Sequence, residues 1–370
     1  MQKFLVIQTA FIGDVVLATG IIEKLHDFFP GAQIDFLVRK GNEALLANHP
    51  FLHEVLVWDK KQHKLRNLWN MGRRIRQAKY DKVINVQRFA ATGLLTAFSG
   101  AGETIGFDKN PLSRWFTKRI PHIVSYSRKP GSGNNTPSPV NAPGSGDQPE
   151  SSGGNPGVTT QSGIARPPVP QHEIERNQEL IRDFTDALPA RPRLYPSQQD
   201  NNRVGEYKGI PYITVSPASV WFTKQYPTGQ WISFINKVPA NYTVYLLGAP
   251  SDVALCEEIR TSSTHPAVKN LAGQLSFLQS AALMTGSAMN YVNDSAPMHF
   301  ASSVNAPVTA VYCSTIPSFG FGPLSDKRFI VEIAEPLDCR PCGLHGYRAC
   351  PKGHFNCARK IEDSQLLQTL

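Results

Sequence analysis

The chain has 370 residues, which is too long for one ordinary domain and enough for two, each with its own core. With 41% hydrophobic and 18% charged residues the composition is that of a globular protein, and no apolar run approaches the roughly 18 residues of a membrane-spanning helix. The short apolar run at the start is not followed by a cleavage site of small residues, so we expect no secretion signal and a cytoplasmic protein.

The formal net charge is +9, and much of the excess lies between Lys60 and Lys129. Basic residues cluster there around Trp69, namely Lys60, Lys61, Lys64, Arg66, Arg73, Arg74 and Arg76. Such a cluster attracts phosphate-rich partners or an anionic membrane surface, although a solvated helix face shows the same pattern. No nucleic-acid-binding module accompanies the cluster, so nucleic acid is not an expected partner.

The first half of the chain alternates between strand and helix patterns. We expect strands at 3–8, 33–40, 54–59 and 81–87, and helices at 15–29 and 67–80. Residues 172–188 form one amphipathic helix in this interpretation and close a first domain over 1–190. Alternating strands and helices predict a doubly wound parallel sheet.

Residues 125–171 interrupt this first domain with a segment rich in Pro, Gly and Ser that cannot build a core. Its composition predicts a flexible, low-complexity insertion, in which a PPVP run is a candidate for partner binding. The polar stretch 191–207 is expected to link the first domain to the second.

The pattern then restarts over 208–370. Strands are expected at 212–217, 242–249, 289–294 and 307–313, and helices at 230–238, 251–262, 276–286 and 295–304. The predicted class is therefore α/β, with two facing doubly wound, Rossmann-like domains.

Ligands of such sheets bind at the carboxyl ends of the strands, where loops lead into helices. In the first of these loops, Gly13 allows a tight turn and Asp14 stands at the start of a helix. Asp14 suits a general base for a sugar hydroxyl, and it also suits a plain helix cap. The loop lacks the GxGxxG pattern of dinucleotide binding.

Two further loops of this kind lie in the second half. Ser216 lies at the end of the strand expected at 212–217, and Ser219 and Lys224 follow it. Together they offer hydroxyls and an ammonium to a phosphate, although a surface lysine is the usual alternative. In the other loop Asp294 leaves a strand, and Ser295 and Pro297 open a helix. Its free N–H groups suit a diphosphate, with His299 one turn further along.

Four cysteines cluster near the end of the chain, at Cys339, Cys342, Cys350 and Cys357. With the histidines between them they form a candidate structural zinc or iron–sulfur site, and reduced, packed cysteines would give the same pattern. A cytoplasmic chain keeps thiols reduced, so disulfides are not expected.

The segment IGDVVLATGII, the SPxSxWxxKxYP pattern and the run DSAPMH occur in this order, and the chain resembles the bacterial heptosyltransferases of lipopolysaccharide core synthesis. The closing CxxC, CPKGH and final Cys are similar to the tail of the second heptosyltransferase. The resemblance implies a GT-B fold, with an N-terminal acceptor domain and a C-terminal domain for ADP-heptose. It also implies inverting transfer without a catalytic metal or other cofactor.

Residue by residue, the resemblance implies that Asp14 is the base and that Lys224 neutralises charge on the departing diphosphate. It assigns the donor to residues that match the family motifs, with a looser match at the acidic one in the GAPSD turn: Ser219, Asp252, Asp294, Ser295, Ala296 and His299. By position and charge, we expect basic residues to hold the anionic lipid A core acceptor at the inner membrane, namely Lys61, Arg66, Lys109 and Arg114.

Two positions depart from the family pattern, since Phe11 replaces a small polar residue and Val220 replaces a donor-loop hydroxyl. Two alternatives therefore stay open. The fold could use another nucleotide sugar, or the protein could be a non-catalytic sugar-nucleotide-binding scaffold.

Overall fold

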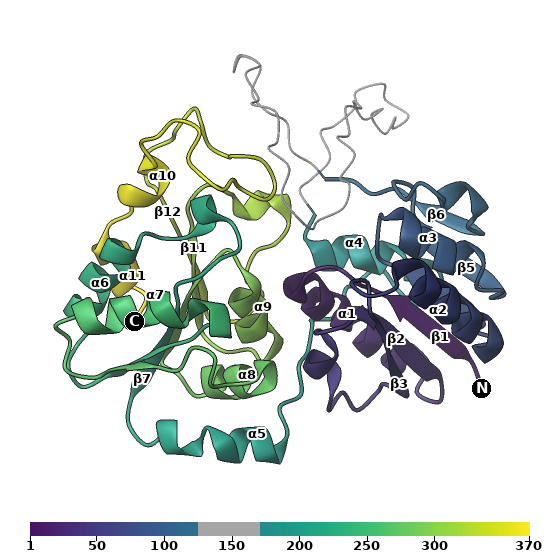
Figure 1. Cartoon of the computed structure of the whole chain (residues 1–370), viewed down its shortest axis with the longest axis horizontal. Helices are drawn as coiled ribbons and strands as arrows, with labels where there is room; N and C mark the ends of the chain where they lie inside the picture. The colour runs from purple at the N-terminus through teal and green to yellow at the C-terminus, as the bar shows by residue number, and fades with distance from the viewer. Residues whose placement is uncertain (125–170) are drawn as a thin grey trace.

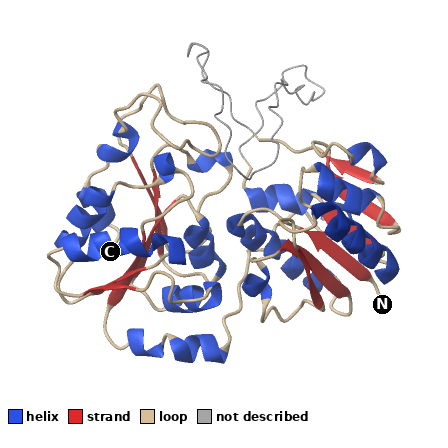
Figure 2. Ribbon diagram, in the orientation of Figure 1, coloured by secondary structure: helices blue, strands red, loops and turns tan. Residues whose placement is uncertain are grey.

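The computed structural model describes residues 1–124 and 171–370. The predicted insertion at 125–171, including its PPVP run, lies outside the described residues except for Gln171. The described parts contain two six-stranded sheets in which neighbouring strands are parallel, with helices packed on both faces of each sheet (Figure 1, Figure 2). The predicted α/β class with two doubly wound sheets is confirmed.

The first sheet has the strand order β3-β2-β1-β4-β5-β6. Its strands are β1 (Lys3–Ile7), β2 (Gln33–Arg39), β3 (Glu54–Trp58), β4 (Lys82–Asn85), β5 (Glu103–Phe107) and β6 (Lys118–Ile120). Its helices are α1 (Ile12–Phe28), α2 (Lys64–Ala78) and α3 (Ala90–Ala97), with short 3-10 helices η1 (Glu43–Leu46) and η2 (Ser113–Trp115).

The second sheet repeats this topology, with the order β12-β11-β10-β7-β8-β9. Its strands are β7 (Tyr212–Ser216), β8 (Thr243–Leu246), β9 (Val268–Asn270), β10 (Met289–Asn293), β11 (Val308–Tyr312) and β12 (Arg328–Glu332). Its helices are α6 (Thr228–Lys237), α7 (Val253–Ser262), α8 (Phe277–Thr285), α9 (Ala296–Ser303), α10 (Asn356–Arg359) and α11 (Asp363–Leu367), with 3-10 helices η5 (Phe222–Lys224), η6 (Pro250–Asp252) and η7 (Pro317–Phe319).

Strand β1 shows why the continuous apolar runs of the sequence become central strands. Phe4 and Val6 point into the core on the α1 side of the sheet, whereas Leu5 and Ile7 point into the core beneath α2 and α3. A strand covered by helices on both faces needs apolar residues at every position rather than at every second one.

The two halves share one apolar cluster. It runs from Phe4 and Val16 on the first side to Met298 and Val308 on the second, and α1 packs directly against α9. The carboxyl ends of β1 and β10, which lead into these two helices, are thereby brought together.

The predicted helix at 172–188 is wrong in its length. The helix α4 (Glu173–Glu179) ends early and a 3-10 helix, η3 (Arg182–Phe184), follows it. The Thr185 hydroxyl donates to Ile181 O at 2.8 Å and the Gln178 amide donates to Asp186 O at 2.6 Å, so side chains bind the backbone where the chain turns. The turn lets Phe184 stack on Phe4, with ring centroids 6.2 Å apart.

The predicted linker at 191–207 contains elements that the sequence did not suggest, α5 (Gln198–Arg203) and η4 (Gly205–Tyr207). Ser197 caps α5 by accepting a hydrogen bond from Asp200 N at 3.1 Å. The helix packs against α8, so this stretch is ordered rather than a free tether. The domain boundaries at 190 and 207 themselves stay predictions.

Among the described residues, no helix combines the length and the apolar character that crossing a bilayer would require.

Candidate active site

Asp14 lies in the first turn of α1, as the third helical residue. The residue at the cap position is Phe11, whose side chain makes no capping hydrogen bond. The interpretation of Asp14 as the helix cap is therefore wrong, although its carboxylate accepts a hydrogen bond from the Phe11 backbone. Its position in the first turn leaves the acidic group next to the positive end of the helix dipole.

The carboxyl group of Asp14 has an unusual protonation equilibrium. The residue as a whole is half-buried, but protein atoms enclose the carboxyl group, and this desolvation raises its pKa to about 7. The charge of Glu173 raises the pKa further, and Arg88 and Arg39 act in the opposite direction. A carboxylate with a pKa near neutrality is suited to exchange protons at physiological pH.

Lys224 is mostly buried and paired with Asp294. Its Nζ lies 2.7 Å from Asp294 Oδ2, and the two side chains are 15% and 8% exposed. Thr315 donates a second hydrogen bond to the same carboxylate oxygen at 2.6 Å. Lys224 is thus not the surface lysine of the alternative interpretation.

The C-terminal tail holds the backbone around Lys224 in place. Thr223 N donates to Tyr347 O at 3.1 Å, and Tyr347 N donates to the Thr223 hydroxyl at 2.7 Å. Gly346 is needed beside them, because its φ is +77° and a Cβ would lie 2.8 Å from the Thr223 hydroxyl. No sequence signal connected this tail to the loop of Lys224.

The helix α9 begins at Ala296, with Ser295 at the cap position and Pro297 in the first turn. The Ser295 hydroxyl makes no capping hydrogen bond with the helix, so capping does not explain this serine. His299 is 5% exposed, which contradicts its interpretation as a surface histidine. Burial lowers the pKa of His299 to about 3, so its imidazole is neutral.

Two buried polar atoms near the start of α9 and the end of β7 have no hydrogen-bond partner among the described residues. They are His299 Nδ1 and the Ser216 hydroxyl. Buried polar atoms are nearly always paired, and an orphan needs an explanation such as an absent ligand or water.

The carboxyl ends of the two sheets meet here. Gly13 packs directly against His299, since a Cβ on Gly13 would lie 2.7 Å from His299 Cδ2. The charge of Arg88 acts on both Asp14 and His345, and that of Lys224 acts on both His345 and His299. The structure therefore brings Asp14 and the Lys224 loop to one site, as their placement on strand-to-helix loops predicted.

Two further donor-side candidates, Ser219 and Asp252, form hydrogen bonds within their own loops. Ser219 is half-buried, and its carbonyl accepts a hydrogen bond from Gln225 Nε2 at 2.5 Å. The carboxylate of Asp252 accepts hydrogen bonds from Ala249 N at 2.8 Å and from the Ser251 hydroxyl at 3.1 Å. Asp252 thus stabilises its own turn, which is a sufficient structural reason for an acid there.

The acceptor-side candidates are exposed on the first half of the molecule, namely Lys61, Arg66, Lys109 and Arg114. Lys60, beside them, is directed inward instead. Its Nζ donates to the Thr9 carbonyl at 3.2 Å and to the Thr9 hydroxyl at 2.8 Å, and burial lowers its pKa to about 8.

Several residues near Asp14 were not predicted. Arg39 and Arg88 end or follow β2 and β4, so the rule of strand carboxyl ends, applied to every strand, would have found them. His122, His172 and Glu173 flank the undescribed segment and reach the site by tertiary packing. Burial lowers the pKa of His122 to about 3 and also lowers that of His172.

The cysteine cluster contains only free thiols. Cys339 Sγ lies 3.9 Å from His354 Nε2, and Cys342 Sγ donates to the Cys339 carbonyl at 3.4 Å. Within residues 1–124 and 171–370, no three His, Cys, Asp or Glu side chains are arranged to hold a metal ion. Burial raises the pKa of Cys357 to about 12, which keeps this thiol protonated.

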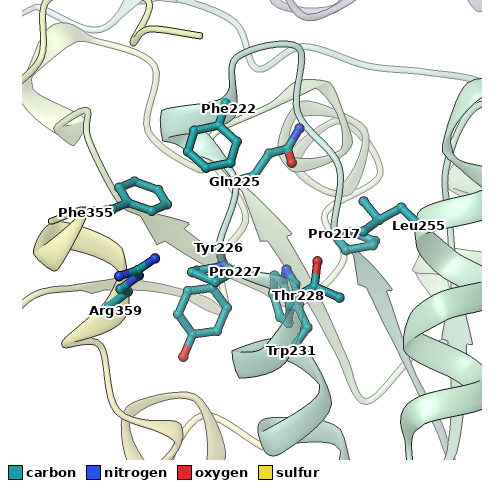
Figure 3. A pocket seen from close by; sticks show the side chains of 10 residues that line it. All are labelled: Pro217, Phe222, Gln225, Tyr226, Pro227, Thr228, Trp231, Leu255, Phe355 and Arg359. Atoms are coloured by element: carbon teal, nitrogen blue, oxygen red, sulfur yellow. The ribbon is translucent and has the colours of Figure 1, made fainter. Parts of the chain in front are cut away.

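A hollow of about 160 Å³ borders the donor loop (Figure 3). Aromatic side chains including Phe222, Tyr226, Trp231 and Phe355 line it, with Arg359 as the charged member. Its volume is below the roughly 300–1,000 Å³ of small-molecule sites, and neither Asp14 nor Lys224 lines it. It is a neighbour of the candidate site rather than the site itself.

Comparison with known proteins finds relatives of similar length and fold. The curated lipopolysaccharide heptosyltransferase 3 of Escherichia coli is 24% identical over 314 residues, covering 82% of this chain and 82% of that protein. The solved E. coli ADP-heptose LPS heptosyltransferase II has a similar fold, with a TM-score of 0.72 and 18% identity over 100% of this chain and 97% of that one. E. coli heptosyltransferase WaaC with ADP-2-deoxy-2-fluoro heptose gives a TM-score of 0.63 and 15% identity, over 99% and 98% of the two chains.

The family model described as glycosyltransferase family 9 (heptosyltransferase) matches residues 157–344, just over half of the chain. This match covers the loops of Lys224 and His299, and both solved relatives have the GT-B fold that the motifs implied. The chain is therefore an enzyme that belongs to glycosyltransferase family 9, the heptosyltransferases.

Proposed function

We propose that this glycosyltransferase transfers heptose from ADP-heptose to the inner core of lipopolysaccharide, with inversion at the anomeric carbon. The observation that carries the proposal is the meeting of Asp14, with a pKa of about 7, and the Lys224–Asp294 pair beside the start of α9. The names of the relatives support the sugar and the acceptor class, and the WaaC complex with an ADP-heptose analogue supports the donor class.

In the proposed reaction the Asp14 carboxylate takes the proton from an acceptor hydroxyl of a Kdo- or heptose-bearing lipid A core. The hydroxyl oxygen forms a bond to the anomeric carbon, and the bond from that carbon to the diphosphate breaks. The electron pair leaves with ADP, and the Lys224 ammonium stabilises the developing charge. Lys224 is paired with Asp294, so a bound diphosphate would share the ammonium group of this lysine with the Asp294 carboxylate.

The donor diphosphate would lie at the first turn of α9, where the backbone N–H groups of Ser295 and Ala296 face no helical acceptor, whereas Pro297 has no N–H and Met298 N donates to Ser295 O. The orphaned His299 Nδ1 and Ser216 hydroxyl would gain partners there. A neutral His299 would donate a hydrogen bond rather than supply charge. We assign Ser219, Ser295 and Asp252 to the donor as well, and Lys61, Arg66, Lys109 and Arg114 to the acceptor.

We propose that the reaction requires no metal, that nucleic acid is not a partner, and that the enzyme acts in the cytoplasm at the surface of the inner membrane. The four C-terminal cysteines would hold zinc or an iron–sulfur cluster only after rearranging, because their present positions do not form a ligand set. Elemental analysis of protein purified without oxygen tests for either metal.

The decisive assay measures ADP release by the full chain with ADP-heptose and a deacylated inner-core acceptor, with and without EDTA. We expect release that depends on the acceptor, persists in EDTA and yields the inverted anomer by NMR. A panel with ADP-glucose and UDP-sugars tests the two alternatives, which are another nucleotide-sugar donor and a non-catalytic scaffold. Phe11 and Val220, the two residues that depart from the family pattern, are 57% and 80% exposed, so their side chains are accessible to a different donor. Binding of every donor without turnover would show a scaffold, and turnover of a different sugar would overturn the heptose assignment.

The pH profile gives a second test of the base. Because Asp14 must be deprotonated to act, kcat/KM is expected to rise as the pH increases through about 7. Glu173 raises the pKa of Asp14 through its charge, so Glu173→Gln should move this limb to lower pH. The control Glu179→Gln, on the same helix α4, should leave the limb in place. A limb that stays fixed in Glu173→Gln would show that it belongs to another group.

A further inference from the structure

The outward face of α3 is apolar over its whole length. Residues 89–102 contain no charged residue, and Phe89, Leu94 and Phe98 are 43%, 38% and 60% exposed. The outer face of a helix in water normally carries charged and polar side chains, while the apolar stripe faces the core. Here both faces are apolar, since Leu95 on the opposite side belongs to the core beneath α2 and α3.

The helix α2 flanks α3 and combines two kinds of exposed residue. Leu65 and Trp69 are 80% and 69% exposed, and Arg66, Arg73 and Arg76 share the outward side of the helix with them. The helix contains no acidic residue. Arg74 pairs with Glu54, but the other arginines of α2 have no carboxylate partner among the described residues. Their positive charge is therefore available to a partner.

The 3-10 helix η2 flanks α3 on its other side. The Arg114 guanidinium lies 4.0 Å from the centroid of the Trp115 ring, which is 50% exposed. Glycines bring the three elements close together: a Cβ on Gly72 of α2 would lie 3.7 Å from Leu95, and one on Gly93 of α3 would lie 3.1 Å from Leu112. Figure 1 shows α2 and α3 side by side over the first sheet.

We propose that the outer faces of α2, α3 and η2 form one surface that lies in the headgroup region of an anionic lipid bilayer. We name it the α2–α3 surface, defined by Leu65, Trp69, Arg73, Arg76, Leu94, Phe98 and Trp115. Trp side chains favour this region of a membrane, apolar side chains enter its edge, and arginines bind lipid phosphates. The excess positive charge and the lack of acidic residues favour an anionic bilayer over a protein partner.

This proposal rests on the proposed function, because a membrane-bound acceptor requires the enzyme to work at the bilayer. Trp115 of the α2–α3 surface lies in the segment that follows the carboxyl end of β5, and Lys109 and Arg114 lie in the same segment. Phe89, next to the α2–α3 surface at the start of α3, follows the carboxyl end of β4. Docking by this surface would place these basic residues at the level of the lipid headgroups. The acceptor sugars would then reach Asp14 without leaving the membrane surface.

The test is sedimentation of the full chain with vesicles of neutral phosphatidylcholine, alone or mixed with anionic phosphatidylglycerol. We expect binding to the anionic vesicles only, reduced about tenfold in Trp69→Ser/Phe98→Ser and in Arg73→Gln/Arg76→Gln. Matched controls, Leu188→Ser/Ile210→Ser and Lys269→Gln/Lys327→Gln, change exposed residues elsewhere and should bind like wild type. Equal binding by all variants, or equal binding to neutral vesicles, would overturn the proposal.

Turnover of the deacylated acceptor separates this proposal from the proposed function. Trp69→Ser/Phe98→Ser should retain full ADP release with that acceptor, since both side chains are exposed and neither is assigned to the donor, the acceptor or the catalytic groups. Absence of ADP release in wild type would contradict the proposed function while leaving vesicle binding to be judged on its own. A dimer that becomes monomeric in Trp69→Ser/Phe98→Ser would show that a second copy covers the surface instead.

Discussion

Replacing Asp14 by asparagine is expected to lower the turnover number by about 10²–10⁴-fold, the usual contribution of a positioned general base. Asparagine keeps the shape of the side chain but cannot accept the hydroxyl proton. The Michaelis constant for the proposed donor, ADP-heptose, should change little, because Asp14 belongs to the half of the molecule to which we assign the acceptor. Steady-state ADP release at pH 8 measures both quantities.

Stability provides an independent readout for the same variant. Because the pKa of Asp14 is raised from 3.8 to about 7 in the folded protein, the folded state retains a proton that the unfolded state loses between these values. The carboxyl group therefore reduces stability as the pH rises from about 4 to 7, and the full penalty is present above 7. Asp14→Asn should have a higher Tm than wild type at pH 8 and a similar Tm at pH 4.

A matched control lies on the same helix. Asp27, near the end of α1, is exposed, and Asp27→Asn should leave turnover and the Tm at pH 8 as in wild type. Undiminished turnover in Asp14→Asn would exclude Asp14 as the base. If the Tm difference between Asp14→Asn and wild type does not change with pH, burial does not raise the pKa of the Asp14 carboxyl group.

Replacing Lys224 by methionine is expected to lower the turnover number by about 10²–10³-fold, as for other single groups that stabilise charge in a transition state. The variant should also be less stable, because it leaves the 8% exposed Asp294 side chain without its cation. Thr315 would remain as its hydrogen-bond donor. Thermal unfolding and ADP release measure the two effects separately.

A double variant distinguishes catalysis from structure. Lys224→Met/Asp294→Asn removes both charges, so it should recover much of the lost stability without recovering turnover. Lys269→Met, which removes an exposed lysine on β9, serves as the charge control and should resemble wild type. Recovery of turnover together with stability would mean that Lys224 only holds the loop in place. The proposed role of Lys224 in stabilising charge on the diphosphate would then be excluded.

The local sequence pattern predicted the central strands well, because the apolar residues of such a strand indicate which of its faces are buried. The run KFLVI is apolar at every position, and in the structure its alternate side chains enter two different cores. The strands β5, β6, β9 and β12 were missed. The edge strands β6, β9 and β12 have partly exposed residues that carry little periodic signal, and they form because a neighbouring strand offers backbone partners. The buried strand β5 is short and contains Gly106, which weakens its strand pattern.

Residue type and position on a strand-to-helix loop were also enough to select Asp14, Lys224, Asp294 and His299. Their interactions were not predictable in the same way. The pair of Lys224 with Asp294 joins loops that are far apart in sequence, and the Tyr347 contact that orders the backbone beside Lys224 comes from the last part of the chain. Glu173 acts on Asp14 only because α4 packs beside α1.

The sequence by itself determined the doubly wound sheets, the loops that meet at the candidate site and, through its motifs, the enzyme family. Only the tertiary structure decided that Asp14 is enclosed, that His299 packs against Gly13, and that the helix expected at 172–188 stops at Glu179. The physical reason is the range of the interactions. Hydrophobic periodicity records which face of one segment is buried, whereas a shifted pKa or an ion pair depends on segments that meet only after the two halves have packed together.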